Sequence, residues 1–424
     1  MVADGYKDTE IGVIPIEWDV AKLETICDVR DGTHDSPKYQ ENGIPFITSK
    51  HLTDNGVDFS DVNYISNEDH INFSKRSLVE NGDILFGMIG TIGKPLIVNY
   101  DFEFSIKNVA LLKFKDNTKL NNSFTLNLLK STIIDKQFSK LSNGGVQSFI
   151  ALGMIRSLKI PLPPLKEQEK IADILSTADD KIDAITSQIE KAQTLKKGLL
   201  QKLLSEGIGH SEFKDSELGK IPLSWEVVKI GSILELLTDY HANGSYEKLS
   251  ENVSLLEKED YSIMVRTTNF EKNNFKDNLI YIDEFAYNYL KKSKVYEHDI
   301  IINKIANAGA TYLMPKIDKP VSLAMNLFLL RFNDSALQQY IYFQIKKNED
   351  RLKLLASGTS TKTITKDDVR GFKILLPPLE EQKQIADILS TADEKLEVLR
   401  AKKEKYETLK KGLLQKLLSG EVRV

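Results

Sequence analysis

The sequence predicts an α+β protein in which two mixed α/β globular domains are joined by two long antiparallel coiled-coil helices, in a pseudo-twofold cyclic arrangement. Three observations lead to this fold class. A long helical stretch at 162–205 recurs at 376–419 without a gap, and 30 of its 44 positions are identical. A short segment that precedes each globular stretch also recurs. The globular stretches themselves agree only in outline, so the chain is an internal duplication whose two parts have diverged.

The first element is a short segment near the N-terminus that recurs before the second globular stretch. It reads YKDTEIGVIPIEWDVAKL over 6–23 and FKDSELGKIPLSWEVVKI over 213–230. The shared pattern Gly-x-Ile-Pro-x-x-Trp indicates a turn followed by a short extended piece whose tryptophan is buried. We interpret each segment as a clasp that packs against the rest of the chain. Stacking of the tryptophan on a nucleic-acid base is the alternative.

Each clasp is followed by a globular stretch, at 24–160 and 231–374. Strands are expected at 44–48, 83–86, 95–99 and 110–114, and in the second stretch at 262–266, 299–302 and 327–332. Helices are expected at 123–139 and 336–355, each before a loop that contains glycine. Residues 82–85 align with 298–301, and 142–148 with 356–362, although the loop residues differ. The globular parts have therefore diverged while the helices have not.

The two repeated helices carry the 3-4 apolar spacing of a coiled-coil seam. Pro-Pro pairs at 163–164 and 377–378 end a preceding strand and permit a helix to start. At ~1.5 Å per residue each helix could extend roughly 60 Å, and the obvious partner for each narrow apolar stripe is the other copy. Lys196, Lys403 and Lys410 interrupt the seam. The seam residues are Leu175, Ala178, Ile182, Ile185, Ile189, Ala192, Leu199 and Leu203, then Leu389, Ala392, Leu396, Leu399, Tyr406, Leu413 and Leu417.

The order of the repeated parts predicts how they close on one another. The first long helix is followed at once by a clasp, whereas the clasp missing after the second helix is found at the N-terminus. The simplest geometry brings the end of the second helix near the start of the chain and makes the helices antiparallel. The expected parts are a first domain at 1–160 with its clasp at 6–23, a first helix at 161–206, a second domain at 207–374 with its clasp at 213–230, and a second helix at 375–424.

Composition excludes several classes of protein. With 41% hydrophobic and 28% charged residues the chain is typical of globular proteins. The single cysteine, Cys27, cannot form an internal disulfide or a cysteine zinc site. No signal peptide and no membrane-spanning run are found, so the expected location is the cytoplasm. The net charge of -4 argues mildly against a general nucleic-acid binder but permits local basic surfaces.

No catalytic or metal-binding pattern is found. The glycine-rich run GMIGTIGKP at 87–95 lacks P-loop spacing and has Pro95 where a hydroxyl residue is needed, so we interpret it as a tight turn between strands. The Pro-Pro pairs lack the preceding Asn or Asp and the following aromatic residue of amino methyltransferases. The six histidines, at 34, 51, 70, 210, 241 and 298, are scattered. We predict no catalytic residue and no metal site.

Polar and basic loops in both globular stretches are candidates for contacts with phosphates and base edges. Arg and Lys read guanine, and Asn and Gln read adenine, in the major groove. For each residue a solvated surface role is the alternative. The candidates are Thr48, Ser49, Lys50, His51, Arg76, Lys94, Asn143, Gly144, Gln147 and Ser148 in the first stretch, and Arg266, Thr267, Thr268, Asn269, Lys304, Asn307, Thr359, Thr361, Lys362 and Lys366 in the second.

The helix motifs are specific enough to suggest a family. Pro-Leu-Pro-Pro-Leu-x-Glu-Gln-x-x-Ile-Ala at 161–172 and Leu-Lys-Lys-Gly-Leu-Leu-Gln-Lys-Leu-Leu at 195–204 open and close the first helix, and nearly the same motifs open and close the second. With this order of parts, the whole chain resembles the specificity (S) subunit of type I restriction-modification systems. The segment DGTHDSPKY at 31–39 also resembles part of some target recognition domains of that family.

The resemblance implies that each globular stretch is a target recognition domain reading half of a bipartite, asymmetric target in double-stranded DNA, and that the helices set the spacing between half-sites. It implies two modification (M) subunits that dock on the helices, bind S-adenosylmethionine and methylate adenine, and restriction (R) subunits that use ATP, with no membrane partner. S-adenosylmethionine, ATP and Mg²⁺ would belong to those partners. The alternatives are a structural coiled-coil adaptor that binds only proteins, and a stand-alone DNA methyltransferase or nuclease with unrecognised motifs.

Gly198 and Gly412 occupy the same position in the two helices. A glycine inside a helix costs about 1 kcal/mol relative to alanine. Close approach of another backbone, or a local bend, would explain both glycines; inheritance by duplication without a function is the alternative.

Overall fold

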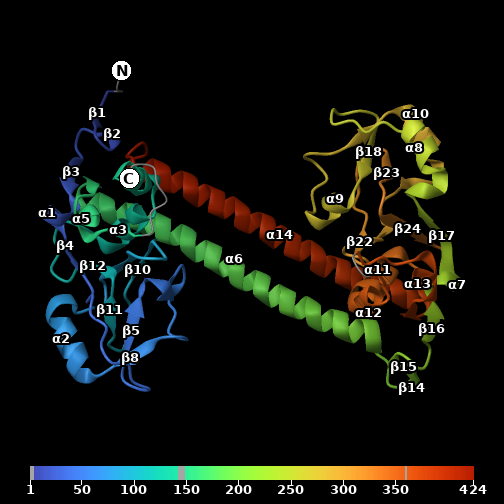
Figure 1. Cartoon of the computed structure of the whole chain (residues 1–424), viewed down its shortest axis with the longest axis horizontal. Helices are drawn as coiled ribbons and strands as arrows, with labels where there is room; N and C mark the ends of the chain where they lie inside the picture. Colours follow the sequence, from blue (N-terminus) through green and yellow to red (C-terminus); the bar gives the residue numbers. More distant parts are fainter. Residues whose placement is uncertain (1–3, 142–148, 359–360) are drawn as a thin grey trace. The chain divides into compact units, whose positions relative to one another are not determined.

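Two compact units make up the chain in the computed structural model, which describes residues 4–141, 149–358 and 361–424. Unit 1 is Met1–Ser187 with Ala401–Val424, and unit 2 is Gln188–Arg400. The globular part of unit 1 is coloured blue to green in Figure 1, and that of unit 2 yellow to orange. Each unit also includes a piece of both long helices.

The two long helices are α6 (Leu165–Glu206) and α14 (Leu379–Leu418), with 42 and 40 residues. Within unit 1, Lys410 on α14 pairs with Asp179 on α6, and the last residues of α14 pack beside the first turns of α6. Within unit 2 the relation is reversed, because Lys196 on α6 pairs with Asp393 on α14. The helices run antiparallel in each unit, as predicted (Figure 1).

The seam residues are buried or half-buried. Lys196 and Lys410, which interrupt the seam, are equivalent positions of the repeat, and so are their partners Asp393 and Asp179. Two of the three interrupting lysines thus form the same interhelical ion pair, once in each unit, whereas Lys403 lies 3.9 Å from Glu407 of its own helix. The buried seam residues are Leu175, Ala178, Ile185, Leu203, Leu389, Leu396, Leu399 and Leu417, and the half-buried ones are Ile182, Ile189, Ala192, Leu199, Ala392, Tyr406 and Leu413.

The repeated clasp begins with a β-hairpin. It pairs β1 (Tyr6–Thr9) with β2 (Gly12–Pro15) in unit 1, and β14 (Phe213–Ser216) with β15 (Gly219–Pro222) in unit 2. The tryptophan that follows each hairpin is completely buried. Its indole N–H donates to a long-helix glutamate, over 3.1 Å from Trp18 to Glu167 and over 2.9 Å from Trp225 to Glu381. The clasps therefore pack as predicted, and in this conformation the indole rings do not face solvent for stacking on a base.

The end of α14 meets the start of the chain within unit 1. The Tyr6 hydroxyl donates to the Gly420 carbonyl over 3.0 Å. The Arg423 guanidinium donates two hydrogen bonds to Glu167, over 2.6 and 3.0 Å, beside the Trp18 indole. The cyclic closure predicted from the order of the repeats is confirmed by these contacts.

The globular part of unit 1 contains two main sheets. Its strands are β3 (Asp19–Lys22), β4 (Asp28–Asp31), β5 (Ile44–Thr48), β6 (Leu52–Thr53), β7 (Gly56–Val57), β8 (Asn63–Ile65), β9 (Ile84–Gly87), β10 (Gly93–Ile97), β11 (Ser105–Lys107), β12 (Val109–Lys113) and β13 (Lys159–Leu162). The first sheet is antiparallel, in the order β10-β9-β12-β4. The second has the order β11-β5-β8, and its β5–β11 pair is parallel. The glycine-rich run predicted as a turn joins β9 to β10.

The globular part of unit 2 repeats this topology. Its strands are β16 (Glu226–Lys229), β17 (Leu234–Asp239), β18 (Ser262–Val265), β19 (Tyr281–Ile282), β20 (Lys294–Val295), β21 (Ile300–Asn303), β22 (Thr311–Leu313), β23 (Val321–Leu323), β24 (Leu327–Phe332) and β25 (Lys373–Leu376). The antiparallel order β22-β21-β24-β17 matches β10-β9-β12-β4 strand for strand. The second sheet again has a parallel pair, β18–β23, and adds β20 at one edge. The two domains share one fold although their sequences align only in outline.

Shorter helices flank the sheets, and two predicted helices are each broken in two. Unit 1 has α1 (Leu23–Ile26), η1 (Ser49–His51), α2 (Asn67–Ser77), α3 (Asn122–Leu129), α4 (Thr132–Leu141) and α5 (Leu152–Arg156). Unit 2 has α7 (Ile230–Ile233), η2 (Tyr240–Asn243), α8 (Tyr246–Asn252), α9 (Thr267–Glu271), α10 (Glu284–Tyr289), η3 (Lys291–Ser293), α11 (Gln338–Lys347), α12 (Glu349–Leu354) and α13 (Lys366–Gly371). The predicted helices 123–139 and 336–355 break after α3 and α11. At these breaks the Ser131 and Asn348 side chains donate to preceding helix carbonyls over 2.6 and 2.9 Å, which competes with helical backbone bonds.

The core of each unit is continuous with the ends of the long helices. In unit 1, Leu175 and Leu417 pack in the same cluster as Ile84 of β9. In unit 2, Leu204 and Leu389 pack in the cluster of Ile300, which holds the equivalent place in β21. Along the described part of the chain, no helix combines the length and apolar character needed to cross a bilayer.

Candidate nucleic-acid interface

In unit 2, four loop segments meet where β17, β18 and β21 end. The Thr267 hydroxyl at the start of α9 donates to the Asn303 side-chain oxygen over 2.9 Å. The Ile364 amide donates to the Lys304 carbonyl over 3.0 Å, and the Ala306 amide donates to the Lys362 carbonyl over 3.2 Å. We call this edge, formed by residues 239–241, 266–269, 303–307 and 361–366, the loop edge of unit 2. Hydrogen bonds between the loops fix it as one surface.

Asp239 connects three segments of the loop edge of unit 2 through its side chain. It is the last residue of β17 and is buried. Its carboxylate accepts a hydrogen bond from the Lys304 ammonium over 3.2 Å and lies 3.3 Å from the Lys366 ammonium. Burial raises the pKa of Asp239, but the Lys304 hydrogen bond and the Lys366 charge outweigh burial and lower it overall. The carboxylate is therefore ionised at neutral pH and holds two cations from different loops.

The candidate residues of unit 2 fall into two groups. Asn269 is buried and holds its own loop, because its side chain accepts from the Arg266 amide over 2.9 Å and donates to the Asn274 carbonyl over 3.1 Å. Thr359 lies outside the described residues. The others lie on the loop edge with solvent-accessible side chains: half-buried Arg266, Thr267, Lys304 and Lys366, and exposed Thr268, Asn307, Thr361 and Lys362.

Unit 1 has a loop edge at the same ends of its strands. The Ser49 hydroxyl joins three loops, because it donates to the Asn108 carbonyl over 3.1 Å and accepts from the Met88 amide over 3.0 Å. Asp31, the last residue of β4, is buried there. Its carboxylate pairs with the Arg76 guanidinium and lies 3.0 Å from His34 Nε2. The loop edge of unit 1 comprises residues 31–34, 48–51, 76, 88–94 and 108.

The candidate residues of unit 1 are placed as follows. Ser49 and His51 are buried and hold the loop: His51 accepts from the Thr48 amide over 2.9 Å, and its other ring nitrogen lies 3.0 Å from the Asp61 carbonyl. Thr48 is half-buried, and Lys50, Arg76 and Lys94 are exposed. Four further candidates lie outside the described residues: Asn143, Gly144, Gln147 and Ser148.

Asp31, His34 and Asp239 do not stand out in the sequence as site residues. Asp31 and His34 lie in the segment DGTHDSPKY, and Asp239 lies in TDYHAN. A carboxylate two or three residues before a histidine, at the end of a strand, is the one signal common to both units. Because an acidic side chain repels phosphate, this pattern does not suggest a DNA-binding site, and the sequence alone does not draw attention to the residues around Asp31 and Asp239.

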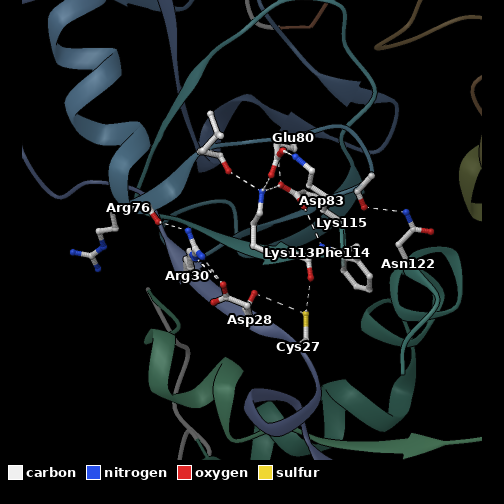
Figure 2. A network of polar contacts seen from close by, with 12 residues as sticks. Cys27, Asp28, Arg30, Arg76, Glu80, Asp83, Lys113, Phe114, Lys115 and Asn122 are labelled. Carbon is white, nitrogen blue, oxygen red and sulfur yellow. Dashed lines mark hydrogen bonds and ion pairs between the residues drawn. The ribbon is translucent and has the colours of Figure 1, made fainter. Parts of the chain in front are cut away.

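A polar cavity of about 810 Å³ lies in unit 1 at the other end of β4 and β12. Figure 2 shows some of its lining side chains, among them Glu80, Lys113 and Lys115, within a network of polar contacts. The Lys113 ammonium lies 2.5 Å from Asp83 and 2.8 Å from Glu80, and Lys115 lies 2.6 Å from Glu80. Hydrogen bonds from these two lysines lower the pKa of Glu80 to about 2. The charged groups of the cavity thus neutralise one another.

The same ion pair recurs in unit 2, which indicates a structural role. Asp299 is equivalent to Asp83, and the Arg331 guanidinium donates to both of its carboxylate oxygens over 2.7 Å. In the unit 1 cavity, burial and then the charge of Asp28 raise the pKa of the Cys27 thiol to about 12. A thiol with so high a pKa is a poor nucleophile at neutral pH.

Two further observations concern the candidate sites. Within 4–141, 149–358 and 361–424, no group of three or more His, Cys, Asp or Glu side chains is placed to hold a metal ion. A Cβ added at Gly198 or Gly412 would meet no heavy atom of the described residues within 4 Å, apart from its own helix backbone. Close approach of another segment of this chain therefore does not explain the two helix glycines.

Comparison with known proteins gives a consistent result. The family model described as type I restriction modification DNA specificity domain matches residues 15–194 and 222–408. The putative type I restriction enzyme MjaX specificity subunit of Methanocaldococcus jannaschii is 32% identical, over 99% of this chain and 97% of its own length. The MjaVIII specificity subunit of the same organism is 28% identical, over 99% and 96%.

Solved structures share the fold. The S subunit of a type I restriction-modification system from M. genitalium gives a TM-score of 0.60 at 16% identity, over 94% of this chain and 96% of that one. A chain from a structure of type I restriction-modification complex assembly gives a TM-score of 0.54 at 17% identity, over 96% of this chain and 99% of that one.

Proposed function

This chain belongs to the type I restriction-modification DNA specificity family, and we propose that it selects the DNA target of such a complex, each globular part reading one half of a bipartite, asymmetric sequence. The observation that carries the proposal is a single topology, present twice, with unlike side chains at the same loop edge. Direct readout depends on the side chains that reach base edges. Two loop edges with different side chains on the same fold can therefore read two half-sites of different sequence.

The long helices are proposed to set the spacing of the half-sites. Each is one uninterrupted helix, and both of its ends are built into the core of a unit. A helix fixes the separation of its ends at ~1.5 Å per residue, so its length would be transmitted to the DNA spacer. The division into two recognition domains and two spacer helices, at the boundaries predicted above, is part of this proposal.

The partners are proposed to be two M subunits and, in the full assembly, R subunits. Leu195 and Leu409, equivalent residues of the two helices, are 60% and 52% exposed. Gly198 and Gly412 are exposed beside them, which leaves room for the backbone of a partner. An identical exposed patch on each helix is the surface that two copies of one partner would need. S-adenosylmethionine, ATP and Mg²⁺ would then be bound by partners in the cytoplasm, and this chain would contribute no catalytic residue.

Two experiments test the function. Methylome sequencing of cells that carry this gene and its M partner is expected to return one bipartite motif; its absence would contradict the proposal. Footprinting of the complex with M should give two protected clusters separated by a fixed spacer. A structural adaptor predicts no sequence-dependent protection, and a stand-alone methyltransferase predicts labelling of the isolated chain by tritiated S-adenosylmethionine.

The glycine pair gives a test of M docking. The double variant Gly198→Ala with Gly412→Ala adds two methyl groups at the proposed contact and stabilises both helices by propensity. Weaker assembly with M, measured by ultracentrifugation, is expected. Unchanged assembly would contradict a contact between these glycines and the backbone of a partner.

A further inference from the structure

Asp31 and Asp239 occupy the same position in the shared topology. Each ends the edge strand, β4 or β17, of the antiparallel sheet. Asp31 lies opposite Ala110 of β12, and Asp239 lies opposite Phe328 of β24. Those two residues lie in turn opposite matching positions of β9 and β21. The equivalence therefore follows from strand register, although the number of residues between the two aspartates differs from the offset of the helix repeat.

Each carboxylate binds at least one nitrogen-bearing side chain from a distant part of its domain. Asp239 holds Lys304, from the loop after β21, and Lys366, from the start of α13. Asp31 holds Arg76, from the last turn of α2, and a ring nitrogen of His34. The carboxylates are buried, whereas the side chains that they hold are between 29% and 60% exposed. In each unit the negative group lies inside and its partners face solvent on the loop edge.

We propose that Asp31 and Asp239 are positioning residues of the two half-site readers, each of which fixes the side chains that contact DNA before DNA binds. This inference rests on the proposed function, because it assigns a role within the same two edges. The residues that touch DNA would be Lys304 and Lys366 in one reader and Arg76 in the other.

Holding these cations in place before DNA binds changes both the entropy cost of binding and the charge that DNA meets. A free lysine side chain loses rotamer freedom when it is fixed on a base edge or a phosphate, and a carboxylate that already holds it reduces that loss. The carboxylate also cancels one of the two positive charges of Lys304 and Lys366. Non-specific attraction to phosphates is thereby reduced while the geometry needed for sequence readout is kept.

The substitution Asp239→Asn separates positioning from folding. Besides the lysines, Asp239 accepts a hydrogen bond from the Ala242 amide over 3.1 Å, which caps η2. Asparagine is equally good at an N-terminal cap, so the substitution keeps the cap and removes only the charge. Asp31→Asn is the corresponding change in unit 1.

The experiment uses the full chain assembled with its M partner and duplexes that carry the methylome target, the target with one altered half-site, or an unrelated sequence. Asp239→Asn is expected to raise affinity for the unrelated duplex several-fold and to steepen its salt dependence by about one unit of slope, because one further cation becomes available. Discrimination against alterations in one half-site should fall about tenfold, with discrimination at the other half-site unchanged. Asp31→Asn should lower discrimination at the other half-site and leave discrimination at the first one unchanged.

Asp367→Asn is the matched control. Asp367 is exposed, adjoins Lys366 on α13 and pairs with Arg370 over 2.9 Å. Its substitution removes the same charge without releasing Lys304 or Lys366, so discrimination at both half-sites should stay at the wild-type level.

The outcomes separate the inference from the function on which it rests. A wild-type complex without sequence preference would contradict the proposed function itself. A selective wild type combined with an Asp239→Asn complex that keeps full discrimination, or that loses affinity for every duplex alike, would overturn the positioning role. If Asp239→Asn fails to fold, Lys304→Gln with Lys366→Gln tests the contact between these lysines and DNA, without which Asp239 has nothing to position. That pair should lose discrimination at the same half-site and show a shallower salt slope, and retained discrimination would contradict the inference.

Discussion

Gln382 joins α14 to the domain of unit 2, and we predict that Gln382→Leu destabilises unit 2 by about 3 kcal/mol. The side chain is completely buried. Its oxygen accepts from the Leu337 amide over 2.8 Å, and its nitrogen donates to the Ser335 and Pro377 carbonyls over 3.0 and 2.9 Å. Leucine has a similar volume but cannot form hydrogen bonds, so these three buried backbone groups lose their partner. A net loss of about 1 kcal/mol for each hydrogen bond gives the total.

The two tryptophans make the assay specific to one unit, because each unit contains one. In a Trp18→Phe background, fluorescence during urea unfolding reports unit 2 through Trp225. For a slope of about 2–3 kcal/mol per molar urea, the loss corresponds to a midpoint lower by about 1 M. Gln168→Leu removes the equivalent contacts of unit 1 and should leave this transition in place. A shift below about 0.3 M, or an equal shift for both variants, would refute the reasoning.

Three further predictions concern other contacts. Asp393→Lys places two cations together in the helix seam and should lower the melting temperature. The exchange Asp393→Lys with Lys196→Asp should restore most of the lost melting temperature, and a double variant as unstable as the single one would contradict the ion pair. Because burial raises the pKa of Cys27 to about 12 from 9.0, the stability that its neutral thiol contributes is complete below pH 9 and is lost as the pH rises toward 12. The difference in urea midpoint between wild type and Cys27→Ser should therefore change over that range, and a constant difference would show a solvated thiol. In a Trp225→Phe background, which leaves Trp18 as the remaining tryptophan, Arg423→Ala should destabilise unit 1 by about 2 kcal/mol because the buried carboxylate of Glu167 loses two hydrogen bonds. The expected result is an earlier change in Trp18 fluorescence during urea unfolding, and an unchanged transition would show that the Arg423 contact adds no stability.

The two long helices could be predicted from the sequence because helix formation depends on residues close in sequence, and because the same pattern occurs twice. The apolar spacing predicted which residues line the seam, and the Pro-Pro pairs predicted where each helix begins. The purpose of the Glu-Gln pair in each opening motif could not be predicted, because its contacts are distant in sequence. Glu167 bonds Trp18 across 149 positions, and Gln168 bonds the Asn121 amide across 47. Repetition shows that such a motif matters but not what it touches.

The two sheets were harder to predict for the same reason. Individual strands such as β5 and β24 could be placed from apolar runs, but strand order depends on pairings between distant segments, such as Thr238 with Leu329. The candidate DNA contacts were chosen by residue type and loop position. Residue type does not distinguish exposed Lys362 from buried His51, nor does it select Asp239, whose role depends on the lysines around it.

The composition of unit 1 has a consequence for how the protein is made. Unit 1 consists of two separate segments, and all of unit 2, Gln188–Arg400, lies between them in the chain. Leu417 and Leu418 pack in the core that contains Trp18. That core is therefore incomplete until the second segment has been synthesised. At 5–20 residues per second, a ribosome needs on the order of ten to forty seconds to translate the intervening unit. Unit 2 is contiguous and can close first, so the domain whose synthesis begins first is the last to be completed, and its apolar surface must be shielded meanwhile.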